Sequence, residues 1–474
     1  MDITKTVFKR QFAMSMYKNL KLPLGEMTFS KDFVMETRRG DLYPIVSRTE
    51  DCTEFVLHNR YLVEQGSVER VVGQFFPYAT YEINCHSRNG EYGFGFQLRD
   101  AKAYVIRRKG KLSFWAGEVQ ECVPVENDSD TMVISCRPGA FDVYFEINGR
   151  PELAHTFKAE SFARSHDQKG FSNGYASVVI KGDAEVKRVR FYIDNGISIA
   201  DIRPIRYENG RVMMEAGKLY FTASIRMQEE MFQGVFSWVP GTADVALTGA
   251  LYYDAGDGLW CGDVAASVLY HREKKAWLLW VCSFNHGHVL AHAAFEGDPR
   301  FGVNVIDVKL MEKAPEGADI SLFAGFEGDE DPDFLYDSGK NRWMMAVCRL
   351  DRESRKYRYV FFESDQPFEG YTCIGMGRPG EETGGSFVTV DGELHFVCGN
   401  SFSAKSEYRI YRKDGMHTAQ FNFPDGGFRG WGTVIPVQQG SRTRYYWLTF
   451  DRHNGSSYNW SYGNFYCFEA KEGE

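Results

Sequence analysis

Three segments of the chain begin with a carboxylate and continue in the same way. They are DVAASVLYHREKKAWLLWVC (263–282), DEDPDFLYDSGKNRWMMAVC (329–348) and ETGGSFVTVDGELHFVC (382–398). In each, spacer residues follow the acid, and an apolar strand, a turn and a second apolar strand ending in cysteine come next. Cys282, Cys348 and Cys398 close the three units at one position. Carboxylates that recur in register on equivalent strands are expected to converge on one site.

Three converging carboxylates suit the hydrolysis of a glycosidic bond. That reaction needs one ionised carboxylate as base or nucleophile and one protonated acid for the leaving oxygen. A third carboxylate nearby would raise the pKa of the acid by like-charge repulsion. Asp and Glu before a strand also commonly cap a turn, and this simpler reading fits any one segment taken alone. The recurrence in three units favours the catalytic reading.

Two weaker copies extend the repeat, at residues 212–225 (VMMEAGKLYFTASI) and 431–450 (WGTVIPVQQGSRTRYYWLTF). Five units at a spacing of roughly 40–65 residues are typical of β-propeller blades. In a propeller the first strand of each blade lines the central channel. The acids that open the three best units, Asp263, Asp329 or Asp331, and Glu382, would therefore face the axis at one end.

Most of the chain alternates apolar and polar residues with period two, punctuated by Gly, Asn, Asp and Pro, which predicts an all-β protein. Residues 26–204 contain alternating strands joined by the turns KGK, NGR and KGD, as in an antiparallel sandwich. Residues 205–474 hold the five repeats and are predicted to form a catalytic five-bladed propeller. Residues 1–25 form an extension in which an amphipathic helix is expected. A 474-residue chain is consistent with two domains.

The run DPDFLYDSGKNRW resembles the second catalytic motif of the five-bladed propeller furanosidases, glycoside hydrolase families 43 and 32. The order Asp263, Asp331, Glu382 is similar to the Asp, Asp, Glu order of that group. The resemblance implies that Asp263 is the base or nucleophile, that Asp331 tunes the acid or stabilises the transition state, and that Glu382 is the general acid. Strict register selects Asp329 instead of Asp331; the Asp-Pro match favours Asp331.

The resemblance implies a hydrolase that removes a terminal sugar, an arabinofuranoside or a fructofuranoside, from a small oligosaccharide. The strand rhythm of residues 26–204 resembles the concanavalin-type lectin sandwich attached to many carbohydrate enzymes, and a packing domain that binds nothing fits equally well. Two alternatives stay open. One is a non-catalytic carbohydrate-binding propeller with a lectin-like module. The other is a related glycoside phosphorylase, for which Arg349, Arg352 and Arg378 are candidate phosphate ligands.

Other side chains are predicted to contact substrate: Trp260, Asp329, His286, His288 and Trp431. Trp260 and Trp431 lie near repeat starts, where an aromatic ring could stack on a sugar or pack between blades. His286 and His288 are spaced to share one face of a strand, which suits a sugar hydroxyl or a metal. No cofactor is expected; a structural calcium ion is considered only because the resembled group sometimes holds one.

The composition and charge of the chain limit the kinds of partner that it is expected to bind. A formal charge of −9 without a basic stripe argues against nucleic acid and suits a neutral substrate. No apolar stretch approaches 18 residues, and Lys9, Arg10 and Lys18 interrupt the apolar residues near the start, so no membrane span or signal peptide is expected. Ten cysteines without CxxC pairs favour reduced thiols and a cytoplasmic protein. The sandwich could support the active-site rim or mediate homo-oligomerisation.

Overall fold

The computed structural model describes residues 2–29, 35–37, 62–64, 67–87, 89–163, 174–182, 184–311, 326–378, 380, 382–400, 407–422, 432–450 and 464–471. These residues are almost entirely β-strand; the helical segment among them is the short 3-10 turn η1 (Glu160–Phe162). Nine described cysteines are free thiols. No helix in the described ranges is long and apolar enough to cross a membrane.

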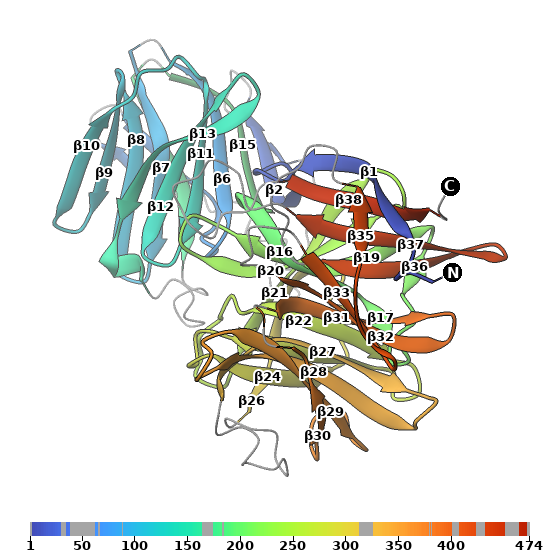
Figure 1. Ribbon diagram of the computed structural model, residues 1–474. Helices are drawn as coiled ribbons and strands as arrows, with labels where there is room; N and C mark the ends of the chain where they lie inside the picture. Colours follow the sequence, from blue (N-terminus) through green and yellow to red (C-terminus); the bar gives the residue numbers. More distant parts are fainter. Residues whose placement is uncertain are drawn as a thin grey trace. The chain divides into compact units, whose positions relative to one another are not determined.

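The chain divides into two compact units (Figure 1). One contains residues 1–20, 195–256 and 261–474, and the other contains residues 21–194 and 257–260. The sequence places residues 195–204 in the sandwich. In the structure they belong to the larger unit, because strand β16 (Ser198–Pro204) pairs with strand β19 (Lys218–Arg226). This shift brings Asp201 and Arg203 into the repeat-containing unit.

Five sheets make up the larger unit among the described residues, and each predicted repeat falls in a different sheet. Sheet I holds β16, β19 with β18 (Met214–Glu215), β20 (Met231–Trp238), β21 (Val245–Asp254) and β25 (Gly302–Asp307). Sheet II holds β17 (Arg206–Tyr207), β22 (Val264–His271), β23 (Ala276–Ser283), β24 (Val289–Phe295) and β26 (Lys309–Leu310). Sheet III holds β27 (Phe326–Asp337), β28 (Arg342–Asp351), β29 (Tyr357–Ser364) and β30 (Thr372–Met376). Sheet IV holds β31 (Glu382–Val390), β32 (Glu393–Asn400), β33 (Glu407–Arg412) and β34 (Gly415–Thr418). Sheet V holds β36 (Thr433–Gln439), β37 (Arg442–Phe450), β38 (Asn464–Lys471), β1 (Val7–Ser15) and β35 (Gln420–Asn422).

The five sheets pack in a ring. One apolar cluster joins sheets I and II, a second joins sheets II, III and IV through Trp280, Phe334 and Phe387, and a third joins sheets IV and V. The ring closes where Phe221 of sheet I stacks on Phe465 of sheet V, with ring centroids 5.9 Å apart. Strands β16, β22, β27, β31 and β36 contact one another around the inside of this ring. These inner strands carry the residues that face the axis.

The expected helix near the N-terminus is wrong. Residues Val7–Ser15 form strand β1, which pairs antiparallel with β38 so that Phe8 lies opposite Ala470. The backbone hydrogen bonds that strand β38 offers to residues 7–15 outweigh the local preference of this segment for a helix. The first strand of the chain thereby completes sheet V.

The smaller unit is a two-sheet sandwich. One sheet orders β13 (Arg150–Lys158), β12 (Ala140–Ile147), β11 (Thr131–Arg137), β6 (Thr80–Ser87), β15 (Ala184–Asp194), β2 (Lys21–Phe29) and β3 (Met35–Thr37). The other orders β10 (Val119–Pro124), β9 (Lys111–Ala116), β8 (Ala101–Arg108), β7 (Glu91–Leu98), β14 (Tyr175–Lys181), β5 (Ser67–Gln74) and β4 (Leu62–Glu64). Aromatic pairs such as Phe96–Phe141 and Phe114–Phe157 fill the space between the sheets. The predicted all-β fold, a sandwich followed by a propeller-type ring, is confirmed; the likeness to concanavalin stays a prediction.

Candidate active site

A β-bulge recurs at one position on four inner strands. The register shifts between Ala200 and Arg203 in β16, Val264 and Ser267 in β22, Glu330 and Asp333 in β27, and Thr383 and Ser386 in β31. The residue just after the shift begins has a positive φ in every case: Asp201 (52°), Ala265 (59°), Asp331 (47°) and Gly384 (59°). A non-glycine residue with this backbone is uncommon and costs energy, and such residues gather at functional sites. Two of the four equivalent positions carry an aspartate.

The bulge positions correct the alignment of the repeats. The last residue before the bulge pairs with Cys282 in sheet II and with Cys348 in sheet III. In sheet IV the corresponding partner is Gly399, one residue beyond Cys398. Asp263, Asp329 and Glu382 are equivalent to one another, and each lies two residues before its bulge. Asp331 therefore corresponds to Asp201 of sheet I, and not to Asp263 or Glu382.

Asp331 is buried at its bulge, and its Oδ2 accepts a hydrogen bond of 2.8 Å from the backbone N–H of Gly384. The pKa of Asp331 is raised to about 7, first by burial and then by the nearby charge of Asp201, while Arg203 opposes this rise. The hydroxyl of Tyr359 lies 3.5 Å from the Asp331 carbonyl oxygen. A carboxyl group with this pKa can carry a proton near neutral pH.

Asp201 is the second aspartate of the bulge set, and the sequence interpretation missed it. Its side chain is buried, and its Oδ2 accepts a 2.5 Å hydrogen bond from the hydroxyl of Ser224, with Arg226 at 3.8 Å. The N–H of Ala265, on the next sheet, donates to the same hydroxyl at 3.1 Å. Asp331, by contrast, accepts a hydrogen bond directly from a backbone N–H of the next sheet, that of Gly384. The run SIADIRPI did contain a signal, since two charged residues interrupt an otherwise apolar strand.

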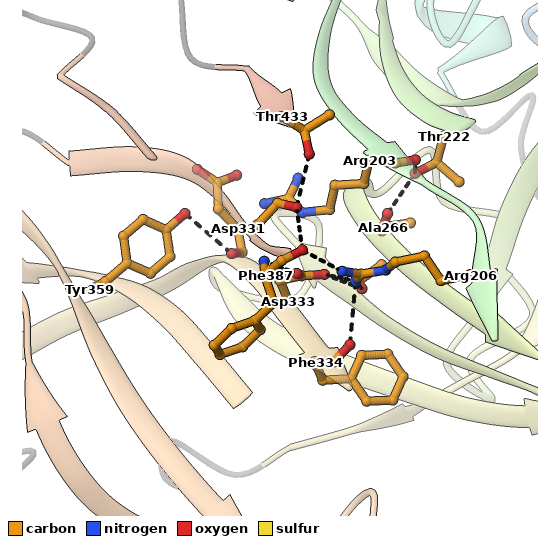
Figure 2. A network of polar contacts seen from close by, with 12 residues as sticks. Arg203, Arg206, Thr222, Ala266, Asp331, Asp333, Phe334, Tyr359, Phe387 and Thr433 are labelled. Carbon is orange, nitrogen blue, oxygen red and sulfur yellow. Dashed lines mark hydrogen bonds and ion pairs between the residues drawn. The ribbon is translucent and has the colours of Figure 1, made fainter. Parts of the chain in front are cut away.

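Arg203 is 1% exposed, yet its Nε, Nη1 and Nη2 make no hydrogen bond within the described residues. Its side chain extends toward Asp331 (Figure 2). Burial would lower the pKa of Arg203, but the charges of Asp331, Asp333 and Asp201 outweigh burial and raise it. The guanidinium is thus a buried cation among three carboxylates.

Asp333 lies two residues beyond Asp331, and both of its carboxylate oxygens are paired within the protein (Figure 2). Its Oδ1 accepts hydrogen bonds from Arg206 Nη2 and Ser267 Oγ, both at 2.5 Å, and its Oδ2 accepts one of 2.6 Å from the N–H of Phe387. Arg206 Nη1 donates to the Phe387 carbonyl at 2.8 Å. These contacts join sheets II, III and IV, and we call Arg206, Ser267, Asp333 and Phe387 the interlock.

Glu382 is fully buried at the start of β31. Arg409 Nη1 donates to its Oε1 at 2.9 Å, the Tyr411 hydroxyl donates to the same oxygen, and the N–H of Tyr359 lies 3.3 Å from Oε2. Tyr359 thus contacts both Glu382 and the backbone of Asp331. This carboxylate is held by an arginine and a tyrosine of its own sheet.

Asp263 and Asp329 contact different side chains from those that hold Asp201 and Asp331. Asn285 Nδ2 donates to Asp263 Oδ1 at 2.9 Å; burial raises the pKa of Asp263, while hydrogen bonds from Ser283 and Asn285 lower it. Asp329 forms a 2.7 Å ion pair with Arg349. Burial raises the pKa of Asp329, and Arg349 opposes this rise. The charge of Asp201 shifts the pKa of Asp331, whereas Asp263 is not among the main causes of that shift.

The other predicted substrate contacts are scattered. His288 Nε2 lies 2.8 Å from Glu330 Oε1; burial would lower the pKa of His288, but this contact raises it. His286 Nδ1 lies 2.8 Å from Ser283 Oγ. Trp260 is buried and groups with the smaller unit, and Trp431 lies outside the described residues. In the described part of the chain, no group of three His, Cys, Asp or Glu side chains could hold a metal ion such as calcium.

No family model matches the chain, and no curated protein matches it. Similar solved structures include a family 43 β-1,3-galactosidase with galactodeoxynojirimycin (9% identity, 57% of this chain, 94% of that chain, TM-score 0.39). Others are the Bacillus subtilis levansucrase (10%, 58% and 84%, TM-score 0.39) and the catalytic domain of a Coprinopsis cinerea family 62 α-L-arabinofuranosidase (11%, 57% and 90%, TM-score 0.36). At these identities and TM-scores the likenesses do not establish the function of this chain.

Proposed function

We propose that the chain is a glycoside hydrolase whose reacting carboxylates are Asp201 and Asp331. The main support for this proposal is that the two buried aspartates occupy equivalent bulges on sheets I and III, and that the charge of Asp201 raises the pKa of Asp331. Glycoside hydrolysis needs two carboxyl groups whose environments separate their protonation. Asp331, with a pKa of about 7, acts as the proton donor, and Asp201 acts as the base or nucleophile.

Glu382 has a supporting role in this proposal. Its Oε1 is occupied by Arg409 and Tyr411, and Tyr359 connects it to the backbone of Asp331. Asp263, the predicted base, contacts Asn285 instead of the Asp201–Asp331 pair. The proposed substrate is a small oligosaccharide with a terminal furanosidic sugar, arabinofuranoside or fructofuranoside, as the DPDFLYDSGKNRW motif suggests.

The test compares Asp201→Asn with Asp263→Asn on a panel of aryl and natural glycosides, including arabinofuranosides and fructofuranosides. General acid–base catalysis contributes about 10²–10⁴-fold, so Asp201→Asn is expected to reduce kcat/KM by that factor, and Asp263→Asn by less than about tenfold. Thermal unfolding of both variants controls for misfolding. If Asp263→Asn lowers turnover as much as Asp201→Asn, the assignment of Asp201 is wrong. If the wild type releases sugar from no glycoside, the hydrolase proposal is wrong.

A further inference from the structure

The guanidinium of Arg203 is an exception to the usual pairing of buried polar groups. Roughly 90% or more of such groups have a hydrogen-bond partner, and an unpaired buried charge is costly. Arg203 is 1% exposed, and its three nitrogens have no acceptor in the described part of the chain. Arg206, three residues later and equally buried, has both terminal nitrogens paired. The fold can therefore pair the terminal nitrogens of a buried arginine here, and it does not do so at Arg203.

The carboxylates around Arg203 are positioned by other donors. Both oxygens of Asp333 are bonded within the interlock. Asp201 Oδ2 accepts from Ser224, and Asp331 Oδ2 accepts from the N–H of Gly384. Because each neighbouring acid has its own protein donors, the N–H groups of Arg203 are available to oxygen atoms that the protein does not supply.

The local charges indicate the kind of ligand. Three carboxylates, Asp201, Asp331 and Asp333, face the guanidinium groups of Arg203, Arg206 and Arg226. An anion would lie beside these acidic side chains, whereas a neutral polyhydroxyl ligand adds no like-charge repulsion. A guanidinium presents five N–H donors in a planar fork, which can reach two neighbouring oxygens at once.

We propose that Arg203 donates hydrogen bonds to two neighbouring oxygen atoms of a neutral sugar bound beside Asp201 and Asp331. This inference rests on the proposed function, since it takes the ligand to be a sugar. Arg203 is then a substrate-binding residue, and its loss weakens sugar binding even where no bond is cleaved.

The experiment measures monosaccharide binding to the full chain by calorimetry, with L-arabinose, D-fructose and D-galactose as probes. Arg203→Lys keeps the charge and loses the planar fork, and it is expected to weaken the affinity of the best-bound sugar by at least about tenfold. Arg206→Lys is the matched control, expected to lower the thermal midpoint while the folded protein keeps its affinity. Arg203→Met serves as a second variant where it folds. A crystal soaked with the sugar should place two of its oxygens within hydrogen-bond distance of Arg203.

Several results would overturn the inference: unchanged sugar affinity in Arg203→Lys, binding of none of the three sugars by the wild type, or a soaked sugar that does not touch Arg203. Inorganic phosphate is the competing probe, and phosphate binding that Arg203→Lys abolishes would assign Arg203 to an anion instead. The binding measurement needs no turnover. Sugar binding through Arg203 without hydrolysis of any glycoside would refute the hydrolase and leave this inference standing. If the wild type hydrolyses a glycoside and Arg203→Lys leaves the KM and the sugar affinity unchanged, the hydrolase proposal stands and the inference about Arg203 is refuted.

Discussion

Arg203 and Arg206 lie in consecutive strands, and both guanidinium groups are buried among aspartates. The two terminal nitrogens of Arg206 bond Asp333 and the carbonyls of Phe387 and Phe334, and its Nε makes no hydrogen bond within the described residues. Arg203 lies beside Asp331 with no acceptor among the described residues. The two arginines thus differ: both terminal nitrogens of Arg206 are bonded within the protein, whereas those of Arg203 make no hydrogen bond within the described residues. A closed network stabilises the fold, and an open one provides a site where a ligand can complete the hydrogen bonds.

The aspartates show the same division. Asp333 accepts three hydrogen bonds at 2.5–2.6 Å, whereas the Asp331 carboxylate accepts one, from Gly384. Residues two apart on a regular strand share one face, so the bulge between Glu330 and Asp333 accounts for the two residues belonging to different networks. The comparison predicts that mutations at Asp333 act mainly on stability and that mutations at Asp331 act mainly on chemistry.

The largest expected effect is on turnover. Asp331→Asn removes the carboxyl group that can donate a proton and is expected to lower kcat by roughly 10²–10⁴-fold on whichever glycoside the wild type cleaves. The amide keeps the shape of the side chain, so the thermal midpoint should be maintained at neutral pH. Steady-state kinetics and a melting curve check this together. A lowered thermal midpoint with an unchanged kcat in Asp331→Asn would show that Asp331 acts on stability and not on chemistry.

Removal of Asp333 should act on folding. Asp333→Ala leaves Arg206 buried without its carboxylate and is expected to reduce the free energy of unfolding by about 3–5 kcal/mol. Urea denaturation of the full chain measures the loss. Asp365→Ala is the matched control, because Asp365 pairs with Arg342 at the surface, and surface pairs contribute at most about 1 kcal/mol. Equal losses in the two variants would refute the stabilising role of the interlock.

The pH dependence of stability sharpens the contrast. The folded-state pKa of Asp331 is raised from 3.8 to about 7, so between these values the folded protein binds more protons than the unfolded chain. The contribution of Asp331 to the free energy of unfolding therefore falls as pH rises from about 4 to about 7, by on the order of a few kcal/mol. Asp331→Asn lacks this titration and should gain stability relative to the wild type at pH 8 compared with pH 5. Denaturation of both proteins at the two pH values checks the sign, and a pH-independent difference would contradict it.

The sequence predicted the parts of this structure that depend on strand pattern. Period-two alternation and the repeated units predicted an all-β chain and one hairpin in each of the five sheets of the larger unit. It could not place Asp201, because residues 205–217 separate the inner strand of sheet I from its partner β19, and the inner strand follows directly on the sandwich in the sequence. The strand belongs to the larger unit only through its pairing with β19, a non-local contact that the sequence pattern does not specify. The positive φ that sets Asp331 apart from Asp329 is likewise a property of the bulge, and both residues look alike in the run GDEDPD.

The smallest effect concerns the support of Asp331 from sheet IV. The N–H of Gly385 donates to the Tyr359 hydroxyl, which lies 3.5 Å from the Asp331 carbonyl oxygen. A Cβ at Gly385 would overlap the Phe396 ring and lie 2.7 Å from Cζ of Tyr359. Gly385→Ala should therefore destabilise the protein by about 1–3 kcal/mol through overpacking. Gly375→Ala is the control, since a Cβ there meets nothing within 4 Å. Because the displaced Tyr359 contacts Asp331 and does not bond Asp333, Gly385→Ala should also lower kcat, an effect that Asp333→Ala should not share while it remains folded. A normal kcat in destabilised Gly385→Ala would show that Tyr359 only packs against the site.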